Sequence, residues 1–344
     1  MNPEPVVSVL MPVYNGEKFL DEAIQSILSQ SFGDFELIAI DDGSTDSTRS
    51  ILEGYAHQDG RVKVFAQENH GLVITLNRGL KLACGKYLAR MDADDVSMLE
   101  RLERQTAVME RNASVVLLGS ACNLVHEDGS LIRVERPPLS NTIIRWQILF
   151  DNPFIHSAVM LRMAIVREHA LEYCPDSVLA EDYDLWSRML DFGLGQNLRE
   201  ALLVRRFHDE QISEIEGAPQ ISGNSAQKIT QANILKLGFT LSEEQADTLR
   251  RWSHQFPRTL NASGQALCMT LLDILDRFCL QLGLENDQLH LVRGRVVLRM
   301  LMARSDEPGG LLWKYLLLRR LSLSDLAWVV KYARHWGRLS RKFL

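Results

Sequence analysis

Three aspartates fall within four positions of the segment YLARMDADDVSMLERLERQ, at Asp92, Asp94 and Asp95. Carboxylates this close together repel one another, so the folded chain has to compensate for their charge. Three settings would do so: the N-terminus of a helix, a bound divalent cation, or a phosphoryl-transfer site with an aspartyl nucleophile.

The neighbouring residues leave these three alternatives open. Ser97 followed by Glu100 predicts a capping box for the helix MLERLERQ, and that cap employs neither Asp92 nor Asp94. Two carboxylates at D-x-D spacing can share Mg²⁺ or Mn²⁺, with substrate phosphates completing its ligand shell. The letters DADDV also match the D-x-D-x-[T/V] pattern of haloacid dehalogenase-like phosphatases. In those enzymes the motif usually ends the first strand, and here it ends the fourth.

The elements that position these acids alternate between short β-rich runs and helical patterns. Strands are predicted at residues 6–12, 35–41, 61–66, 86–92 and 114–120, with amphipathic helices between them. Solidly apolar strands in this alternation predict an α/β fold with a mostly parallel central sheet covered by helices. Ligands bind beyond the carboxyl ends of such strands, where the acids at 41–42 and 92–95 fall.

The pattern changes after residue 120. Residues 121–135 predict a hairpin that turns at Asp128-Gly129. A helix over 142–150, a strand over 156–162, a helix over 180–193 and a strand over 200–208 follow. Residues 213–225 are polar and loop-like, so we expect a catalytic domain over 1–215 and a helical domain over 216–344. A capping box at Ser242 and Gln245 starts one of its helices.

Composition indicates an ordinary globular protein of a reducing compartment. The chain has 344 residues, 46% of them hydrophobic, and a formal net charge of −6. Its five cysteines are scattered without a C-x-x-C, which argues against disulfides and zinc. The N-terminus lacks a basic region before its first apolar run, and no apolar stretch of about 18 residues occurs. We expect a cytoplasmic protein.

The last part of the chain is basic. Residues Leu311–Leu344 contain eight Lys or Arg against one Asp, among Trp, Leu, Val and Tyr. Such a tail suits an anionic membrane surface, or its apolar faces pack on the helical domain or a partner chain. Nucleic acid is not an expected partner, because the rest of the chain is acidic and no binding motif occurs.

Several motifs in a fixed order carry a family resemblance over residues 5–213. They are VSVLMPVYNGEKFLDEAIQSILSQSF, FELIAIDDGSTDST, ENHGLVITLNRGLKLACGKYLARMDADD, AEDYDLWSRML and RRFHDEQIS. Together they resemble the family 2 glycosyltransferases, which are inverting enzymes with a GT-A fold. Each motif alone is weak, whereas the ordered set is specific.

The resemblance implies a binding site for a nucleoside-diphosphate sugar. Pro12 and Tyr14 match the family's P-V-Y-N, beside the base and ribose of the donor. Asp42 matches the second Asp of D-D-G-S, which binds the base, often through a uracil N–H; this favours UDP over GDP or dTDP. Gly71 would let the backbone approach the ligand. Relatives often carry an Arg where Leu76 stands here, so we expect no contact between the side chain at this position and the diphosphate.

The same resemblance implies a metal site, with Mn²⁺ or Mg²⁺ as the cofactor. Asp94 of the D-x-D motif would bind the metal directly, and Asp92 would bind ribose, or the metal through water. His208 matches a histidine after the last strand that ligates the metal or touches the diphosphate in many relatives. Arg205 and Arg206 beside it are candidates for contacts with phosphate. The alternative for His208 is an ordinary surface or core histidine.

The resemblance also implies the catalytic base. Asp182 of the E-D motif would take the proton of the acceptor hydroxyl, and Glu181 is the second candidate. The alternative is that both acids merely favour a helix N-terminus. Asn152 and His156, in DNPFIHSAVMLR, are expected near the acceptor.

We therefore expect a metal-assisted inverting glycosyltransferase that uses a glycan or lipid-linked acceptor, in bacterial surface polysaccharide synthesis. Two other classes remain as alternatives: a catalytically silent protein that binds sugar nucleotides, and a phosphohydrolase with Asp92 as nucleophile.

Overall fold

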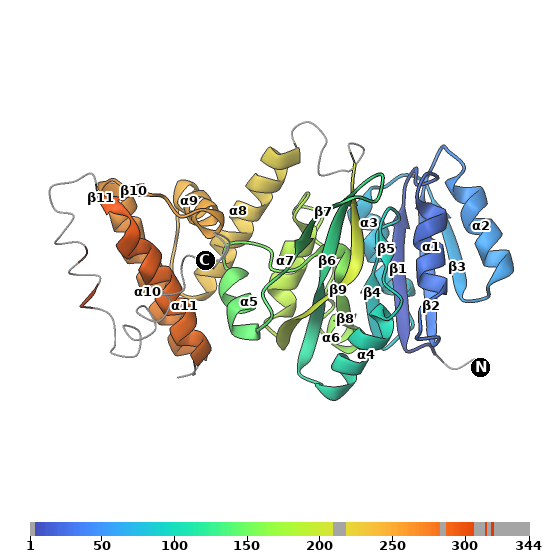
Figure 1. Cartoon of the computed structure of the whole chain (residues 1–344), viewed down its shortest axis with the longest axis horizontal. Coiled ribbons are helices and arrows are strands. Elements are labelled where there is room, and N and C mark those ends of the chain that lie inside the picture. The colour runs from blue at the N-terminus through green and yellow to red at the C-terminus, as the bar shows by residue number, and fades with distance from the viewer. Residues whose placement is uncertain (1–3, 209–217, 283–286, 306–313, 315–317, 320–344) are drawn as a thin grey trace. The chain divides into compact units, whose positions relative to one another are not determined.

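The computed structural model describes residues 4–208, 218–282, 287–305, 314 and 318–319. The chain divides into two compact units (Figure 1). The first comprises Met1–Ile144 and Asn152–Ser225, and the second comprises Arg145–Asp151 and Ala226–Leu344. The domain boundary expected at residue 215 falls within 209–217, outside the described residues.

Four parallel strands form one side of the main sheet of the first unit. They lie in the order β3-β2-β1-β4, with the bounds Val7–Val13 (β1), Phe35–Asp42 (β2), Val62–Gln67 (β3) and Tyr87–Arg90 (β4). Every residue of β1 and β2 is buried. Burial on both faces accounts for their nearly continuous apolar sequence. The predicted parallel pairing of these strands is confirmed.

Beyond β4 the sheet becomes mixed. It continues in the order β8-β6-β9-β5, with β7 paired to β6, and the bounds are Val96–Ser97 (β5), Val115–His126 (β6), Leu131–Glu135 (β7), Met160–Arg162 (β8) and Leu194–Phe207 (β9). Strand β8 runs antiparallel to both β4 and β6, whereas β6 and β9 are parallel. The predicted hairpin is β6–β7, and Gly129 in its turn has φ +82°, a left-handed value that favours glycine.

Helices cover both faces of the parallel strands. The helical elements of the first unit are α1 (Leu20–Leu28), α2 (Thr48–Gln58), α3 (Leu72–Leu82), α4 (Arg101–Arg111), the N-terminal part of α5 (Asn141–Gln147), η1 (His156–Ala158), α6 (Met163–Glu168) and α7 (Glu181–Met189). Helices α1 and α4 pack Ile24 and Leu102 into one core with Val9 of β1. On the opposite face, α3 brings Gly79 against Leu10. The alternation of β1 side chains thus supplies two apolar layers.

The capping box predicted at Ser97 is wrong. Ser97 belongs to the two-residue strand β5, and its backbone N–H donates to the Ser26 hydroxyl at 2.9 Å. Helix α4 begins at Arg101, and its N-cap residue Glu100 makes no side-chain cap. The local pattern was overridden because β5 pairs with β9, through Val96 and Val204.

The described residues of the second unit are mainly helical. Its elements are the C-terminal part of α8 (Ala218–Lys236), α9 (Glu243–His254), α10 (Ala262–Leu282), α11 (Asp287–Met302), and the short strands β10 (Thr259–Leu260) and β11 (Arg304–Ser305). The capping box of Ser242 and Gln245 is confirmed. The loop expected over 213–225 is wrong from Ala218 onward, where α8 begins. The basic tail lies outside the described residues except for 314 and 318–319.

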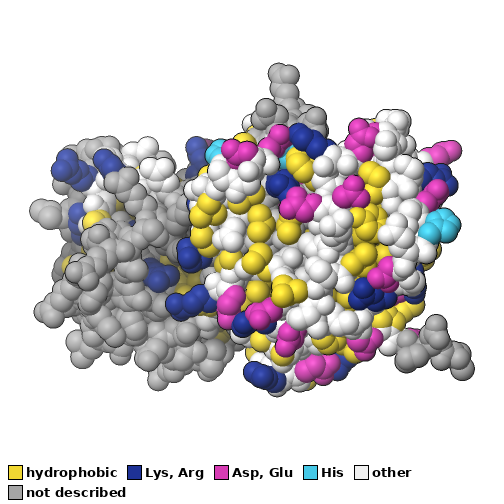
Figure 2. Space-filling view, turned by 45° about the vertical axis from the view of Figure 1, so that its right-hand side comes forward, with side chains coloured by type: hydrophobic (Ala, Val, Ile, Leu, Met, Phe, Trp, Pro, Cys, Tyr) yellow, Lys and Arg dark blue, Asp and Glu magenta, His cyan; other side chains and the backbone are white. Residues whose placement is uncertain are grey.

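The surface of the first unit mixes both signs of charge. On the face shown in Figure 2, acidic and basic side chains are interspersed among hydrophobic ones. The close grouping of Asp92, Asp94 and Asp95 is therefore a local feature that needs its own explanation. In the part of the chain that the structure describes, no helix is long and apolar enough to span a bilayer.

The contact between α3 and β1 gives a test of the fold. A Cβ atom at Gly79 would lie 2.1 Å from Cδ1 of the buried Leu10. We expect Gly79→Ala to lower the free energy of unfolding by about 1–3 kcal/mol, because it overpacks the core. Nothing lies within 4 Å of the corresponding Cβ at Gly54 in α2, so Gly54→Ala should raise it by about 0.5–1 kcal/mol. Urea denaturation measures both, and two effects of the same sign would contradict this packing.

Candidate active site

The carboxyl ends of three parallel strands bring the predicted donor residues to one edge of the sheet. Val13 of β1 pairs with Asp41 of β2, and Leu10 pairs with Arg90, the last residue of β4. Pro12 lies two residues after Leu10, where the pairing of β1 with β4 has ended. Its missing N–H therefore removes no hydrogen bond between these two strands. Asp42 and the acidic triplet follow directly at the same edge.

Tyr14 stands at this edge with 54% of its surface exposed. This exposure shows that the Tyr14 ring does not pack into the core. The turn after it is built by Asn15, which has φ +49° and accepts the N–H of Thr45 at 2.8 Å. A rigid turn thus holds an exposed aromatic ring beside the end of β1.

Asp42 orders the loop that precedes α3. Its Oδ1 accepts Gln67 Nε2 at 2.7 Å and the His70 N–H at 2.9 Å, and its Oδ2 accepts the Gly71 N–H at 2.9 Å. Gly71 has φ +85°, which explains why glycine stands there. Gln67 is itself oriented by Arg78, which donates to its Oε1 at 2.8 Å. These hydrogen bonds fix the Asp42 carboxylate. Each of its oxygens can accept a further hydrogen bond only from a direction that no present donor occupies.

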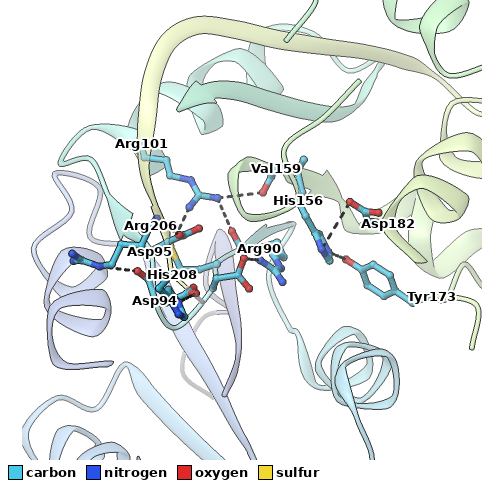
Figure 3. Close-up of polar contacts among 12 residues, drawn as sticks. Arg90, Asp94, Asp95, Arg101, His156, Val159, Tyr173, Asp182, Arg206 and His208 are labelled. Atoms are coloured by element: carbon cyan, nitrogen blue, oxygen red, sulfur yellow. Dashed lines mark hydrogen bonds and ion pairs between the residues drawn. The ribbon is translucent and has the colours of Figure 1, made fainter. Parts of the chain in front are cut away.

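The acidic triplet forms a compact set of possible metal ligands. One ligand atom from each of Asp92, Asp94 and Asp95 lies within 4.8 Å of the others. Each carboxylate faces a different partner: Asp92 forms an ion pair with Arg90, Asp94 meets His208 Nε2 at 2.9 Å, and Asp95 accepts the Arg206 N–H at 3.2 Å (Figure 3). These oxygens suit a hard divalent cation.

Burial disfavours the ionised form of carboxyl groups in the acidic triplet. Asp95 is 1% exposed, and burial together with the charges of Asp92 and Asp94 raises its pKa well above the usual range. Burial also raises the pKa of Asp92, against the opposing effect of Arg90. The neighbouring arginines therefore neutralise the negative charge of the triplet only in part, and a bound metal cation would neutralise the rest.

His208 reaches Asp94 because β9 pairs with β5. The register sets Val96 opposite Val204, so the residues that follow Val204 run beside the D-x-D segment. The side chain of His208 is only 8% exposed and packs at 5.2 Å from the ring of Phe19. The prediction that His208 joins the acidic site is thus consistent with its position, although its role as a ligand stays a prediction.

The two arginines before His208 contact protein groups. Arg205 forms an ion pair with Glu135 at 3.1 Å. Arg206 donates to the backbone carbonyl of Asp94 at 3.0 Å, pairs with Glu22 and lies over the ring of Phe19 at 4.9 Å. Both side chains thus brace the site, and the suggested phosphate contacts stay predictions.

A second acidic pair lies at the start of α7. Glu181 and Asp182 are its first two residues, and Asp182 Oδ2 accepts Asn152 Nδ2 at 2.7 Å. His156 faces the same oxygen, with its Nδ1 at 4.0 Å, and its Nε2 meets the Tyr173 hydroxyl at 3.2 Å. The structure therefore gathers the predicted base and both predicted acceptor residues. An acid that served only the helix dipole would not need these contacts.

Asn77 supports this group from α3. Its Nδ2 donates to the carbonyl of Tyr173 at 2.8 Å, and its Oδ1 accepts the Tyr173 N–H at 2.7 Å. This pair of hydrogen bonds fixes the backbone of Tyr173 and therefore the hydroxyl that faces His156. Asn77 thus clamps the chain beside the predicted base.

Burial shifts the pKa values of the titratable residues around Asp182. It raises the pKa of Glu181 to about 7 and that of Asp182 to about 6. It also raises the pKa of Tyr173 and lowers that of His156 well below its usual range. At pH 7, His156 is therefore a neutral ring, and Asp182 is mostly ionised. Carboxyl groups with such raised pKa values are suited to accept a proton near neutral pH.

Arg90 lies between the two acidic groups, as Figure 3 shows. It is 2% exposed, and its charge acts on Asp92 on one side and on Asp182 and His156 on the other. Asp92 raises the pKa of Arg90 even though burial opposes it. Sequence reasoning missed this residue. The available signal was an arginine placed two positions before an acidic cluster at a buried strand end.

Comparison with known proteins agrees with this architecture. Residues 8–169 match the model of Glycosyl transferase family 2. A glycosyltransferase of Haemophilus influenzae is 36% identical over 239 residues, which cover 67% of this chain and 73% of that protein. The Escherichia coli O-antigen biosynthesis glycosyltransferase WbnJ is 34% identical over 60% of this chain and 81% of its own length.

A solved structure shows the same fold. S. aureus TarS 1-349, in complex with UDP-GlcNAc, superposes with a TM-score of 0.56 at 18% identity, covering 96% of this chain and 92% of that one. The fold and site define a glycosyltransferase of the GT-A type. The chain belongs to glycosyltransferase family 2, so an interpretation as a phosphohydrolase is no longer needed to explain the D-x-D motif.

The buried carboxyls give a prediction for pH-dependent stability. Their pKa values rise on folding from the ordinary 4.5 for Glu181 and 3.8 for Asp182. The folded state thus binds these protons more tightly than the unfolded state. The stability they contribute is present below about pH 4 and lost as the pH rises through 6 to 7.

Arg90→Met should steepen that loss, because the Arg90 charge lowers both pKa values. We expect the free energy of unfolding to fall by about 3–5 kcal/mol at pH 8, and by less at pH 5, where the carboxyls can protonate. Arg90→Lys is the control that keeps the charge. Guanidinium denaturation at the two pH values measures the difference. An equal loss at both would refute the assigned electrostatic role.

Proposed function

We propose that this glycosyltransferase transfers a sugar, with inversion, from a nucleoside-diphosphate sugar to a hydroxyl group of a glycan or lipid-linked acceptor. The observation that carries the proposal is the pair of acidic groups, Asp92–Asp95 and Glu181–Asp182, which are both acted on by the charge of Arg90. Figure 3 shows Arg90 between Asp94 and Asp95 on one side and Asp182 on the other. One group suits a diphosphate–metal complex, and the other has a carboxyl group that can accept a proton near neutral pH.

The donor is proposed to be UDP-linked rather than GDP- or dTDP-linked. Tyr14 offers an exposed ring for the base, and the fixed carboxylate of Asp42 would accept a ring N–H from a pyrimidine. The UDP-GlcNAc complex of TarS, which shares the fold, supports this choice. Pro12, near the carboxyl end of β1, and Gly71, in the loop before α3, would shape the same pocket at this edge of the sheet.

The acidic triplet fits Mn²⁺ or Mg²⁺, because three carboxylates of like charge supply oxygen ligands within a small volume. Asp94 would hold the metal directly, together with His208. Asp92, already paired with Arg90, would bind the ribose or act through water. When bound, the cation acts as a Lewis acid that stabilises the charge of the departing nucleoside diphosphate.

Asp182 is proposed as the general base. Its side chain is 18% exposed, so a hydroxyl can approach it, and its pKa of about 6 leaves it ionised at pH 7. It would take the proton as the acceptor oxygen attacks the anomeric carbon opposite the diphosphate, which inverts the configuration. Glu181, 6% exposed with a pKa of about 7, is the secondary candidate.

The biological setting is proposed from the relatives. WbnJ carries the description of an O-antigen biosynthesis enzyme, which supports a bacterial surface polysaccharide as the product. We place the protein in the cytoplasm, peripheral to the inner face of the membrane. The basic tail of residues 311–344 would contact anionic lipid there.

Nucleotide binding tests the donor site. Calorimetric titration of UDP, GDP and dTDP, with and without Mn²⁺, should show Mn²⁺-dependent binding of UDP. Asp94→Asn should weaken it at least tenfold, because it removes a charged metal ligand. Asp34→Asn is the matched control, since Asp34 precedes β2 at the opposite end of the strand. The proposal fails if no nucleotide binds, or if both variants bind like the wild type.

Turnover tests the base. Asp182→Asn should lower the rate of UDP release from UDP-GlcNAc or another UDP-sugar by about 10²–10⁴-fold without weakening UDP binding. Asp184→Asn is the control, because Asp184 is also a first-turn acid of α7 but pairs with Arg188 at 2.6 Å. Equal rates for Asp182→Asn and wild type would favour the silent binding protein. Equal losses of rate in Asp182→Asn and Asp184→Asn would mean that the substitutions disturb α7 in general, and would not support Asp182 as the base.

A further inference from the structure

The carboxamide of Asn152 has only one orientation that satisfies its surroundings. Its Oδ1 accepts the N–H of Phe154 at 3.0 Å, two residues ahead in the chain. An oxygen that accepts this bond leaves the NH₂ group on the other side, where Nδ2 donates to Asp182 Oδ2 at 2.7 Å. The turn thus aims a donor at the carboxylate, and rotation of the amide would break both hydrogen bonds.

The backbone beneath Asn152 is also fixed. The next residue, Pro153, restricts the conformation of Asn152, and its carbonyl accepts Nδ2 of Asn197 at 3.1 Å. Asn197 is 2% exposed and also donates to the carbonyl of Pro138. Phe154 is 5% exposed. A buried amide and a buried ring therefore anchor the turn from which Asn152 reaches Asp182.

The other neighbours of Asp182 do not replace this contact. His156 Nδ1 lies 4.0 Å from Oδ2, beyond hydrogen-bond distance, and its Nε2 faces Tyr173. Oδ1 accepts the N–H of Tyr183, the adjacent residue in α7. Asn152 comes from the loop between α5 and η1, thirty positions earlier. The hydrogen bond from Asn152 thus fixes the orientation of the Asp182 carboxylate from outside α7, the helix that carries Asp182.

We propose that Asn152 is a positioning residue that holds the Asp182 carboxylate in place to receive the proton of the acceptor hydroxyl. This inference rests on the proposed role of Asp182 as base. It replaces the expectation that Asn152 binds the acceptor itself. In the step, the acceptor O–H bond breaks and its proton passes to Asp182. The oxygen bonds to the anomeric carbon while the carbon–oxygen bond to the diphosphate breaks, and that electron pair goes to the phosphate oxygen.

An amide that donates to a carboxylate also favours its ionised form. Burial raises the pKa of Asp182, whereas the N–H of Tyr183, the charge of Arg90 and the hydrogen bond from Asn152 lower it. The other titratable groups that act here are Glu181 and Tyr173, with neutral His156. Loss of the amide removes one of the contributions that lower the pKa of Asp182, so the carboxyl should hold its proton to a higher pH.

The experiment measures the Asp182 pKa in the unliganded full-length protein, by carbon-13 NMR with labelled aspartate carboxyl carbons. Asp182→Asn identifies the resonance. We expect it to titrate near pH 6 in the wild type and about one pH unit higher in Asn152→Ala, a tenfold change in proton affinity. Asn152→Asp should raise it further, because a second carboxylate replaces the donor.

Asn112→Ala is the matched control. Asn112 makes the same kind of turn, with its Oδ1 accepting the Ser114 N–H at 3.1 Å, at the end of α4. A titration unchanged in Asn112→Ala and raised in Asn152→Ala supports the inference, whereas an unchanged or lowered pKa in Asn152→Ala overturns it.

The pH profile of UDP release separates this inference from the proposed function. If Asp182 is the base, the acidic limb of the rate profile should shift to higher pH in Asn152→Ala, by the same amount as the NMR titration, while the affinity for UDP stays constant. A limb that stays in place while the NMR titration moves overturns Asp182 as base but leaves the Asn152–Asp182 contact intact. A merely structural role would lower the rate at every pH alike.

Discussion

The buried charge of Arg90 is the constraint on which the rest of the site depends. Five carboxylates gather at one edge of the sheet, namely Asp92, Asp94, Asp95, Glu181 and Asp182. Burial raises the pKa of four of them. Arg90 opposes that shift at Asp92 and at both acids of α7. Without such a cation the pKa values of these acids would rise further, which would weaken the metal binding and the proton transfer proposed for them.

A second buried arginine holds the backbone around Arg90. Arg101 is fully buried at the start of α4 and donates to the carbonyls of Arg90 and Val159, at 2.7 and 3.4 Å. Burial lowers its pKa to about 10, so it remains charged at pH 7. Through these carbonyls it joins the end of β4, which leads to the D-x-D segment, to the chain that follows His156. The segments that carry the acidic triplet and His156 thus share one anchor.

Local signals in the sequence predicted some features well and others poorly. Continuous apolar strands fix parallel pairing because burial on both faces demands them, and the motifs at their carboxyl ends marked Asp42 and the triplet. The cap at Ser97 failed because a two-residue strand pairing outweighed a local preference. The contacts of Arg90 and Asn152 escaped prediction, since both depend on partners brought close only by folding.

By itself the sequence determined the α/β class, the family and the edge of the sheet where the candidate site lies, because periodicity and strand-end motifs are local properties of the chain. The tertiary structure decided which side chains meet. The pairing of β5 with β9 brings His208 to Asp94 across 114 positions. The turn at Asn152 reaches Asp182 across 30. No local pattern encodes these contacts, because they follow from strand order and register.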